Sequence, residues 1–232
     1  METSNDYIIS VIVPFHKSSI FLNDIRKTIN SASTAVEAIY VIDEKLNDFI
    51  KKPNQNEHIV VVKNISRGQT LAEGLKKASG EIVVFLHSDT ILPSGWDLII
   101  RNVMKDKRII GGGFSLQFDK KHFFLKILTL LSNLLFYFSK ELWGDRAIFV
   151  RTKPLKNNIS ILSAPIMEDV RLSSWMKKNG NVVLLKSKVT TSSETFFKYG
   201  LIRNTIRIIK VRLWYLVGHD LQRIFDYYYK KK

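Results

Sequence analysis

The stretch EIVVFLHSDTILP, residues 81–93, decides the predicted architecture. Its apolar run Ile82 to Leu86 is typical of a buried strand, and the run ends abruptly at His87, Ser88 and Asp89. In a parallel sheet, ligands bind beyond the carboxyl ends of the strands, so a carboxylate at such an end indicates a binding site. Asp and Ser also begin ordinary turns, and three residues alone leave both interpretations open.

The flanking sequence alternates between strand and helix patterns. Apolar runs predict strands at residues 7–13, stopped by Pro14, at 38–42, ending at Asp43, and at 59–62. Helical spacing predicts helices at 21–29, 69–80 and 95–106, the second of them closed by Gly80. Continuous apolar strands separated by helices predict an α/β fold with a mostly parallel central sheet flanked by helices.

The second half of the chain differs in composition. It continues with predicted strands at 109–118, 147–152 and 181–192, an apolar helix at 123–138 and a helix at 167–179 stopped by Gly180. From about residue 196 the pattern is helical, amphipathic and basic. With no internal repeat or low-complexity linker, the prediction is one domain over residues 1–195 and a C-terminal basic amphipathic helical appendage over 196–232.

The charge of the chain is uneven. Of its net charge of +15, residues 1–118 contribute +1, from 14 Lys and Arg against 13 Asp and Glu, and residues 119–232 contribute +14, from 22 against 8. The second half therefore suits an anionic partner such as phosphate, a membrane surface or nucleic acid. The absence of cysteine excludes disulfides and thiolate sites and fits a reducing cytoplasm. No signal peptide is expected at the N-terminus.

Three further segments carry candidate functional residues. PIMEDVRLSSW places Glu168 and Asp169 at the start of a helix, where acidic side chains are also ordinary caps. WGDRAIFVRT places Asp145 before a strand, where a simple turn is the alternative. NISRGQTLAEG places Arg67 at a helix start, where backbone N–H groups and a guanidinium can bind phosphate, although the full P-loop pattern is missing.

Taken in order, these segments resemble family 2 glycosyltransferases, which have the nucleotide-diphospho-sugar transferase (GT-A) fold. ISVIVPFHK is similar to the first strand of that family, and residues 66–93 are similar to the stretch that leads to its Asp-x-Asp metal motif. GDRAIF and IMEDVRLSSWMKKNG resemble its acceptor-side strand and catalytic helix. The resemblance covers roughly residues 7–192 and is closest to a compact bacterial subgroup associated with arsenosugar biosynthesis.

The resemblance implies an enzyme that moves a sugar from a nucleotide-diphosphate sugar to an acceptor hydroxyl. It implies Asp169 as general base with Glu168 in support, and a divalent cation, Mn²⁺ or Mg²⁺, held on the donor diphosphate by Asp89 and His87. One base without a second nucleophilic carboxylate indicates a single displacement with inversion. The implied donor-binding residues are Pro14, Asp43, Arg67, Ser88 and Asp89, and the implied acceptor-binding residues are Trp143, Asp145 and Arg146.

Two departures from the family pattern bear on these roles. His87 stands where the family has the first Asp of its metal motif. The site therefore has one carboxylate ligand fewer for a hard cation, and the imidazole favours Mn²⁺ over Mg²⁺ in relative terms. The segment DEKLND, residues 43–48, lacks the usual Asp-rich loop, which weakens the assignment of the nucleotide base. A catalytically inactive relative that binds sugar nucleotides or membranes is therefore an alternative hypothesis.

The basic tail and the apolar helix predict contact with a membrane surface. Ile202, Ile206, Ile209 and Leu213 recur at helical spacing beside basic residues, typical of a helix in a membrane interface, with Trp214 and Tyr227–Tyr229 at headgroup depth. The alternative is a stripe packed on the domain. The expectation is a cytoplasmic protein, peripheral at the inner face of the cell membrane, with a lipid-linked acceptor as one candidate. No aromatic-rich RNA-binding motif occurs, so nucleic acid is the least favoured partner.

Overall fold

A computed structural model describes residues 9–15, 22–45, 53–63 and 65–230. Predictions for residues 7, 8, 21 and 46–48 lie outside these ranges. The centre is an eight-stranded sheet with strand order β3-β2-β1-β4-β7-β6-β8-β5, in which four of the seven neighbouring pairs are parallel. The strands are β1 Ile9–Phe15, β2 Val36–Asp43, β3 Glu57–Val62, β4 Ile82–Phe85, β5 Thr90–Ile91, β6 Ile109–Phe118, β7 Ile148–Arg151 and β8 Asn181–Thr191.

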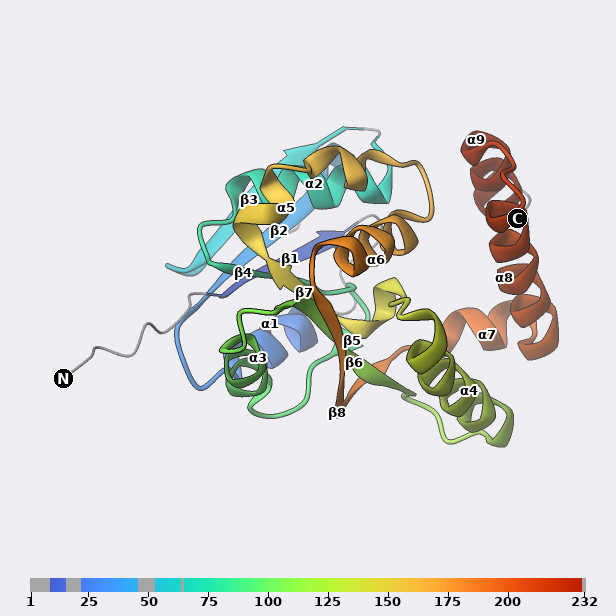
Figure 1. The fold of residues 1–232 in the computed structure, drawn as a ribbon, viewed down its shortest axis with the longest axis horizontal. Helices are drawn as coiled ribbons and strands as arrows, with labels where there is room; N and C mark the ends of the chain where they lie inside the picture. The colour runs from blue at the N-terminus through green and yellow to red at the C-terminus, as the bar shows by residue number, and fades with distance from the viewer. Residues whose placement is uncertain (1–8, 16–21, 46–52, 64, 231–232) are drawn as a thin grey trace.

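Helices cover both faces of this sheet (Figure 1). One face carries α1 and α3, and the other carries α2, α5 and α6. This is the predicted α/β architecture with a mostly parallel, helix-flanked sheet. The helices are α1 Leu22–Asn30, α2 Arg67–Lys77, α3 Trp96–Met104, α4 Phe123–Ser139, α5 Thr152–Lys156, α6 Glu168–Asn179, α7 Glu194–Tyr199, α8 Leu201–Leu216 and α9 Leu221–Phe225. Short turns η2 Gly144–Arg146, η3 Ile159–Ser163 and η4 Asp226–Lys230 complete the described elements.

The core follows directly from the apolar strands. Successive side chains of a strand point to opposite faces, so a strand covered on both faces must be apolar throughout. In β1, Val11 and Val13 belong to the hydrophobic cluster beneath α1 and α3, whereas Ile12 belongs to the cluster beneath α2 and α6. All three are fully buried. The continuous runs read from the sequence therefore predict the two-faced burial correctly.

Two predicted boundaries are wrong, for backbone reasons. Strand β1 does not stop at Pro14 but includes it. The carbonyl of Ile12 accepts a hydrogen bond from the N–H of Leu86 at 2.9 Å. The backbone polar groups of Ile12, and those of Pro14 two residues later, therefore point towards the β4 side of the strand. Pairing with β4 ends at Ile12, and the missing N–H of Pro14 costs no ladder bond. Helix α2 ends at Lys77, and the N–H of Gly80 donates instead to Ser10 Oγ at 2.8 Å.

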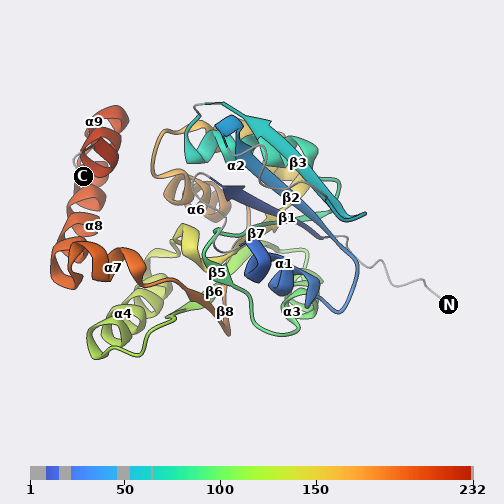
Figure 2. The same ribbon diagram turned by 180° about the vertical axis from the view of Figure 1, so that it is seen from behind.

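The C-terminal helices stand at one end of the molecule. Figures 1 and 2 show α8 and α9 beyond the sheet, at the end towards which strand β1 points. Val211 of α8 and Ile224 of α9 are buried with Ile166, just before α6. The predicted boundary between residues 195 and 196 falls within α7, and that division stays a prediction. Within the described residues, none of the helices combines the length and apolarity needed to cross a membrane.

The tight contact between α2 and η3 gives a prediction about stability. A Cβ atom on Gly68 would lie 2.0 Å from the carbonyl oxygen of Leu162 and 2.8 Å from that of Ala164. Gly68→Ala should therefore destabilise the protein by about 1–3 kcal/mol and lower the melting temperature by several degrees. Helix propensity alone predicts the opposite sign, a gain of about 1 kcal/mol. A melting curve beside the control Lys77→Ala, at an exposed residue of the same helix, decides, and a stabilised Gly68→Ala protein would contradict the packing.

Candidate functional site

Four segments far apart in the sequence meet at the carboxyl edge of the sheet. Arg67 opens helix α2, Asp89 follows strand β4, Asp145 lies in turn η2, and Asp169 lies in the first turn of α6. The guanidinium of Arg67 interacts electrostatically with all three of these aspartates. Arg67 thus joins the end-of-strand carboxylate to the helix-start carboxylate in one polar cluster.

The centre of this cluster is a buried ion pair between Arg67 and Glu168. Nη1 of Arg67 donates to Oε1 of Glu168, and the two side chains are 19% and 5% exposed. The negative charge of Glu168, with those of Asp169 and Asp145, raises the pKa of Arg67 even though burial alone would lower it. The guanidinium also packs against Gly144, where a Cβ atom would lie 2.5 Å from Nη2. A larger residue at position 144 would therefore clash with the guanidinium of Arg67.

The carboxylate of Asp169 is fixed by two backbone N–H groups at the start of α6. Its Oδ2 accepts the N–H of Gly144 at 2.9 Å, and its Oδ1 accepts the N–H of Val170 at 2.8 Å. Burial, followed by the charge of Glu168, raises the pKa of Asp169 to about 6, with Arg67 and the two N–H groups opposing the shift. A carboxylate with a pKa in this range is ionised at neutral pH and is a stronger base than an ordinary aspartate.

The backbone before Asp169 adopts a costly conformation. Met167, the N-cap of α6, has a φ of 65° in the left-handed region. A residue with a side chain pays about 1–3 kcal/mol in such a region and stays there only when its surroundings fix it. Ile166 and Met167 pack against the C-terminal helices, which fix this loop from outside the sheet. The left-handed backbone of Met167 and the packing of Ile166 and Met167 together fix the position of Glu168 and Asp169 in the cluster.

His87 and Asp89 contact each other directly. Nδ1 of His87 and Oδ1 of Asp89 share a hydrogen bond, and the side chains are 31% and 27% exposed. Burial lowers the pKa of His87, but the hydrogen bond and the charge of Asp89 outweigh it, so the net pKa is raised. The pKa of Asp89 is lowered, because the contact with His87 outweighs its burial. Asp89 is thus an anionic end-of-strand group beside an imidazole.

Asp89 and His87 are the side chains of this edge that could hold a cation. Within the described ranges, no group of three or more His, Asp or Glu side chains is placed to hold a metal ion. Asp89 and His87 offer one carboxylate and one imidazole, a donor pair that Mn²⁺ accepts. The pair therefore fits a cation whose other ligands come from a bound phosphate, and it does not fit a cation held by the protein alone.

Asp89 also lines a cavity of about 420 Å³. The hydroxyl-bearing residues Thr190, Thr191 and Ser192, from the end of β8, form another wall. This volume is in the range of small-molecule sites. Hydroxyl groups next to a carboxylate provide both donors and acceptors of hydrogen bonds, which suits a polyhydroxylated ligand.

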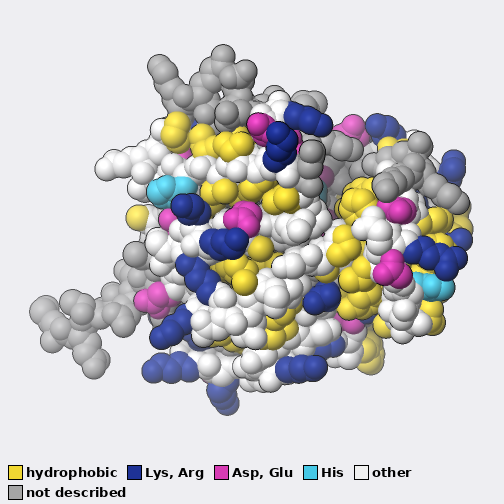
Figure 3. Space-filling model, turned by 90° about the horizontal axis from the view of Figure 1, so that it is seen from above, with side chains coloured by type: hydrophobic (Ala, Val, Ile, Leu, Met, Phe, Trp, Pro, Cys, Tyr) yellow, Lys and Arg dark blue, Asp and Glu magenta, His cyan; other side chains and the backbone are white. Residues whose placement is uncertain are grey.

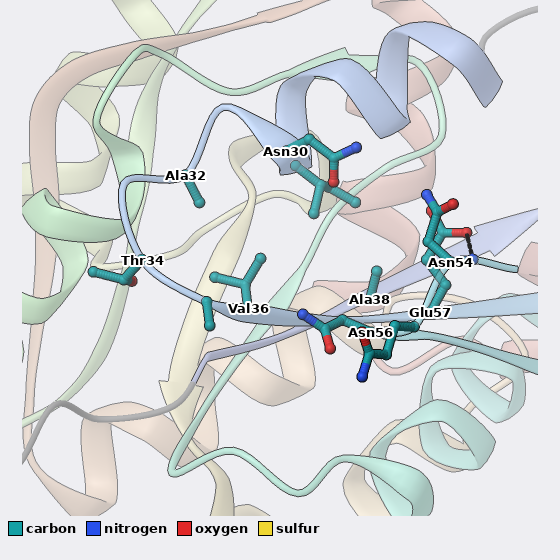
Figure 4. Close-up of a pocket in the computed structure, with 11 residues that line it drawn as sticks. Asn30, Ala32, Thr34, Val36, Ala38, Asn54, Asn56 and Glu57 are labelled. Carbon is teal, nitrogen blue, oxygen red and sulfur yellow. Dashed lines mark hydrogen bonds between the residues drawn. The ribbon is translucent and has the colours of Figure 1, made fainter.

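A second cavity, of about 370 Å³, lies at the opposite ends of the strands (Figure 4). Its lining includes Val36 and Glu57, the first residues of β2 and β3, so it is remote from the carboxyl edge. Glu57 already accepts hydrogen bonds from Arg26, Tyr40 and Asn54, the last at 2.9 Å. Its carboxylate has a structural role between neighbouring elements, and this cavity lies away from the cluster around Arg67.

Other predicted site residues lie near the same edge. Pro14 and Asp43 come from the ends of the neighbouring strands β1 and β2, and Oδ1 of Asp43 accepts the N–H of Lys45 at 3.0 Å. Ser88 is half-buried in the turn between His87 and Asp89. Trp143 is half-buried and precedes turn η2. Their roles towards a ligand stay predictions.

The predicted acceptor role of Arg146 needs correction. Arg146 is 1% exposed, and its guanidinium donates to Asn133 at 2.8 Å, to the carbonyl of Phe114 at 3.2 Å and to Ser132. Burial lowers the pKa of Arg146 to about 10. The side chain points between α4 and β6 rather than towards Asp169. It fastens the apolar helix to the sheet, a structural role that its neighbour in sequence, Asp145, does not share.

Two residues of the tail reach the site and were not predicted there. Tyr228 is half-buried and packs against the cluster of Ile166, Val211 and Ile224; burial raises its pKa, and it interacts with Asp145 and Arg67. Tyr229 keeps 41% of its surface exposed, and its phenol interacts electrostatically with Arg67, Glu168 and Asp169. The sequence pattern predicts both tyrosines at headgroup depth in a membrane interface. It contains no signal for their position beside the site, because that position depends on how α8 and α9 pack on the loop before α6.

Comparisons with known proteins agree with this fold. A family model described as Glycosyl transferase family 2 matches residues 10–158. No curated protein sequence matches the chain. A crystal structure of S. aureus TarS 1-349 is similar, with a TM-score of 0.59 and 18% identity over 95% of this chain and 70% of that one. The structure of S. aureus TarS 1-349 in complex with UDP-GlcNAc has a TM-score of 0.59 and 17% sequence identity, over 80% of this chain and 58% of that one. A further S. aureus TarS structure has a TM-score of 0.60 and 17% identity, over 92% of this chain and 40% of that one. At these identities the likeness shows a shared fold.

Proposed function

The chain belongs to glycosyl transferase family 2, and from that premise we propose that it transfers a sugar from a nucleotide-diphosphate sugar to an acceptor hydroxyl with inversion. One observation carries the proposal. Arg67 pairs with Glu168 and packs against Gly144, whose N–H donates to Asp169 at 2.9 Å, and the same guanidinium interacts electrostatically with Asp89, which lies 80 residues before Asp169. A group that anchors a departing diphosphate and a group that accepts a proton must lie around one substrate, and Arg67 joins them.

The three needs of the reaction are met by different residues. Arg67, at the start of α2, supplies positive charge and helix N–H groups for the leaving diphosphate. Asp169 takes the proton of the acceptor hydroxyl as that oxygen attacks the anomeric carbon, and the bond from that carbon to the diphosphate oxygen breaks. Glu168 positions Arg67 and raises the basicity of Asp169 through its charge. With one base in place, a single displacement inverts the anomeric carbon.

A divalent cation belongs to the proposal as an aid to the donor. Asp89 and His87 would hold Mn²⁺ or Mg²⁺ together with the diphosphate oxygens, and the cation would neutralise charge on the leaving group. Its binding would require a neutral His87, with a ring nitrogen that carries no proton towards the cation. Pro14, Asp43 and Ser88 complete the proposed donor side, and Trp143 and Asp145 complete the proposed acceptor side.

The test of the proposal uses the purified protein and a panel of sugar nucleotides. Thermal shift with UDP-, GDP- and TDP-sugars, with and without Mn²⁺, should identify a donor that raises the melting temperature. Hydrolysis or transfer from that donor should then be measurable. The TarS complex with UDP-GlcNAc makes UDP-sugars the first donors to test. Binding without turnover under any condition would support a catalytically inactive relative instead.

Removal of the carboxylate at the sheet edge should separate donor binding from proton transfer. We expect Asp89→Ala to weaken metal-dependent donor binding by about tenfold to a hundredfold, because the diphosphate and its cation lose a charged ligand. Chelation of divalent ions should weaken donor binding of the wild type and leave that of Asp89→Ala almost unchanged. Isothermal titration with the donor measures both effects, with Glu81→Ala, at an exposed acidic residue before the other end of β4, as control. Equal sensitivity of both proteins to the chelator would contradict the role of Asp89.

The remaining parts of the proposal concern context. We propose a hydroxyl acceptor, with a lipid-linked alcohol as one candidate, and a peripheral position at the inner face of the cell membrane. We also propose the division into a glycosyltransferase domain over residues 1–195 and a basic tail over 196–232. Membership of the arsenosugar-associated subgroup remains a proposal that a positive result with one donor class would narrow.

A further inference from the structure

Helix α8 turns an apolar stripe towards solvent. Ile202, Ile206, Ile209 and Leu213 lie on one helical face, and each keeps between 53% and 64% of its surface exposed. The opposite face is the buried one, with Val211 packed against Ile166. The stripe therefore does not pack on the domain, contrary to the alternative considered from sequence. The predicted headgroup position of Trp214 is also wrong, because Trp214 packs inward with the tail tyrosines.

Helix α4 carries a second stripe of the same kind. Its outer face includes Phe123, Leu130, Leu134 and Phe138, which are between 51% and 81% exposed. Its inner face is anchored at Leu125, Ser132 and Phe136. A soluble monomer rarely exposes so many large apolar side chains on adjacent helices without a binding partner.

The two stripes belong to one end of the molecule. The ring of His122, which caps the start of α4, contacts Phe197 of α7, with centroids 5.9 Å apart. Beyond the other end of α4, Glu141 pairs with Arg212 of α8. Figures 1 and 2 show α4, α7 and α8 gathered beyond the sheet from either side. We name the exposed stripes of α4 and α8 the end face.

Positive charge borders the end face, and negative charge is absent from its helices. Neither α4 nor α8 contains an Asp or Glu. The exposed cations Arg203 and Lys210 recur at i and i+7 on one flank of the α8 stripe, and Lys126 lies beside the α4 stripe. Figure 3, seen from above, shows hydrophobic, basic and acidic side chains close together at the end of the molecule formed by the C-terminal helices. A second copy of this chain would place these cations against one another, which is unfavourable.

We propose that the end face binds peripherally to an anionic phospholipid bilayer. The apolar stripes would enter the acyl boundary, and the flanking Lys and Arg would meet lipid phosphates, the arrangement of an interfacial amphipathic helix. The inner surface of the same C-terminal segment packs on Ile166 and Met167, which directly precede Glu168 and Asp169. A bound bilayer would therefore lie beside the acceptor side of Asp169. The docking surface stands without the proposed function, and only the supply of a membrane-borne acceptor rests on it.

The experiment measures flotation of the full chain with vesicles in the absence of nucleotide. Wild type should bind vesicles of phosphatidylcholine with about a quarter phosphatidylglycerol at least about tenfold more tightly than pure phosphatidylcholine vesicles. Ile206→Ser/Leu213→Ser and Leu130→Ser/Leu134→Ser should each weaken binding by about tenfold or more. Arg203→Gln/Lys210→Gln should abolish the preference for anionic lipid and much of the salt dependence. Leu98→Ser, at a 48% exposed residue of α3, is the matched control and should bind as wild type does.

Each outcome of the flotation experiment supports or overturns membrane binding by the end face. Unchanged vesicle binding by both apolar double variants would overturn the proposal, as would equal binding of wild type to neutral and anionic vesicles. A lipid-free dimer that Ile206→Ser/Leu213→Ser dissociates, with no vesicle binding, would assign the end face to a second copy. Because the substituted side chains are exposed, folding should be retained, as circular dichroism will show. Thermal shift with the donor, without lipid, should be unaffected in every variant, so failure of membrane binding is distinct from failure of the proposed function.

Discussion

Replacing Asp169 by Asn should lower the rate of sugar transfer by roughly 10³-fold while donor binding stays within about twofold. The amide has nearly the shape of the carboxylate and can still accept the N–H of Gly144, but it cannot take a proton from the acceptor hydroxyl. Single-turnover transfer and a donor titration on the same preparation measure the two effects. Asp106→Asn, at a half-buried aspartate paired with Arg108 far from the site, is the control.

The pH dependence of the wild type tests the same residue independently. Because the pKa of Asp169 is raised to about 6, the base is protonated and inactive below that pH and ionised above it. The rate should therefore fall about tenfold per pH unit below 6 and level off above 7. The residual rate of Asp169→Asn should lack this inflection. Full transfer activity in a folded Asp169→Asn protein, or a wild-type profile that is flat from about pH 5 to 8, would exclude Asp169 as the base.

Replacing Arg67 by Met should give the largest combined loss of stability and donor affinity. The substitution leaves the carboxylate of Glu168, whose side chain is 5% exposed, buried without its cation. Breaking a buried pair from one side costs about 3–5 kcal/mol, which corresponds to a fall in melting temperature of roughly 10 °C or more. Donor affinity should fall as well, because the positive charge at the diphosphate is lost. Thermal melts and donor titration are the measurements.

A double variant separates the two consequences. Arg67→Met/Glu168→Gln removes both charges, and it should recover much of the stability lost by Arg67→Met. It should not recover donor affinity, because no guanidinium returns to the site. Recovery of both quantities would mean that Arg67 serves the fold alone. A loss of neither in the single variant would mean that the ion pair is not buried as the structure shows.

Most of the fold could be predicted from the sequence because its cause is local. A strand buried on both faces must be apolar throughout, so the strands Ile9–Phe15 and Ile82–Phe85 can be recognised in the sequence as continuous apolar segments. Asp89 and Asp169 could be proposed because each follows such a local signal. The end of β1 and of α2 could not be placed, since Pro14 and Gly80 are decided by which neighbouring strand or loop offers a hydrogen-bond partner.

By itself, then, the sequence determined the alternating architecture, the acidic residues at element ends and the concentration of positive charge in the second half. Only the tertiary structure decided which residues meet: the Arg67–Glu168 pair across 101 residues, the inward turn of Arg146 and of Tyr228, and the outward turn of the α8 stripe. The physical reason is that periodicity fixes which side chains share a face of an element. Which way that face points depends on packing between elements, and an amphipathic helix with two competing faces carries no local record of the outcome.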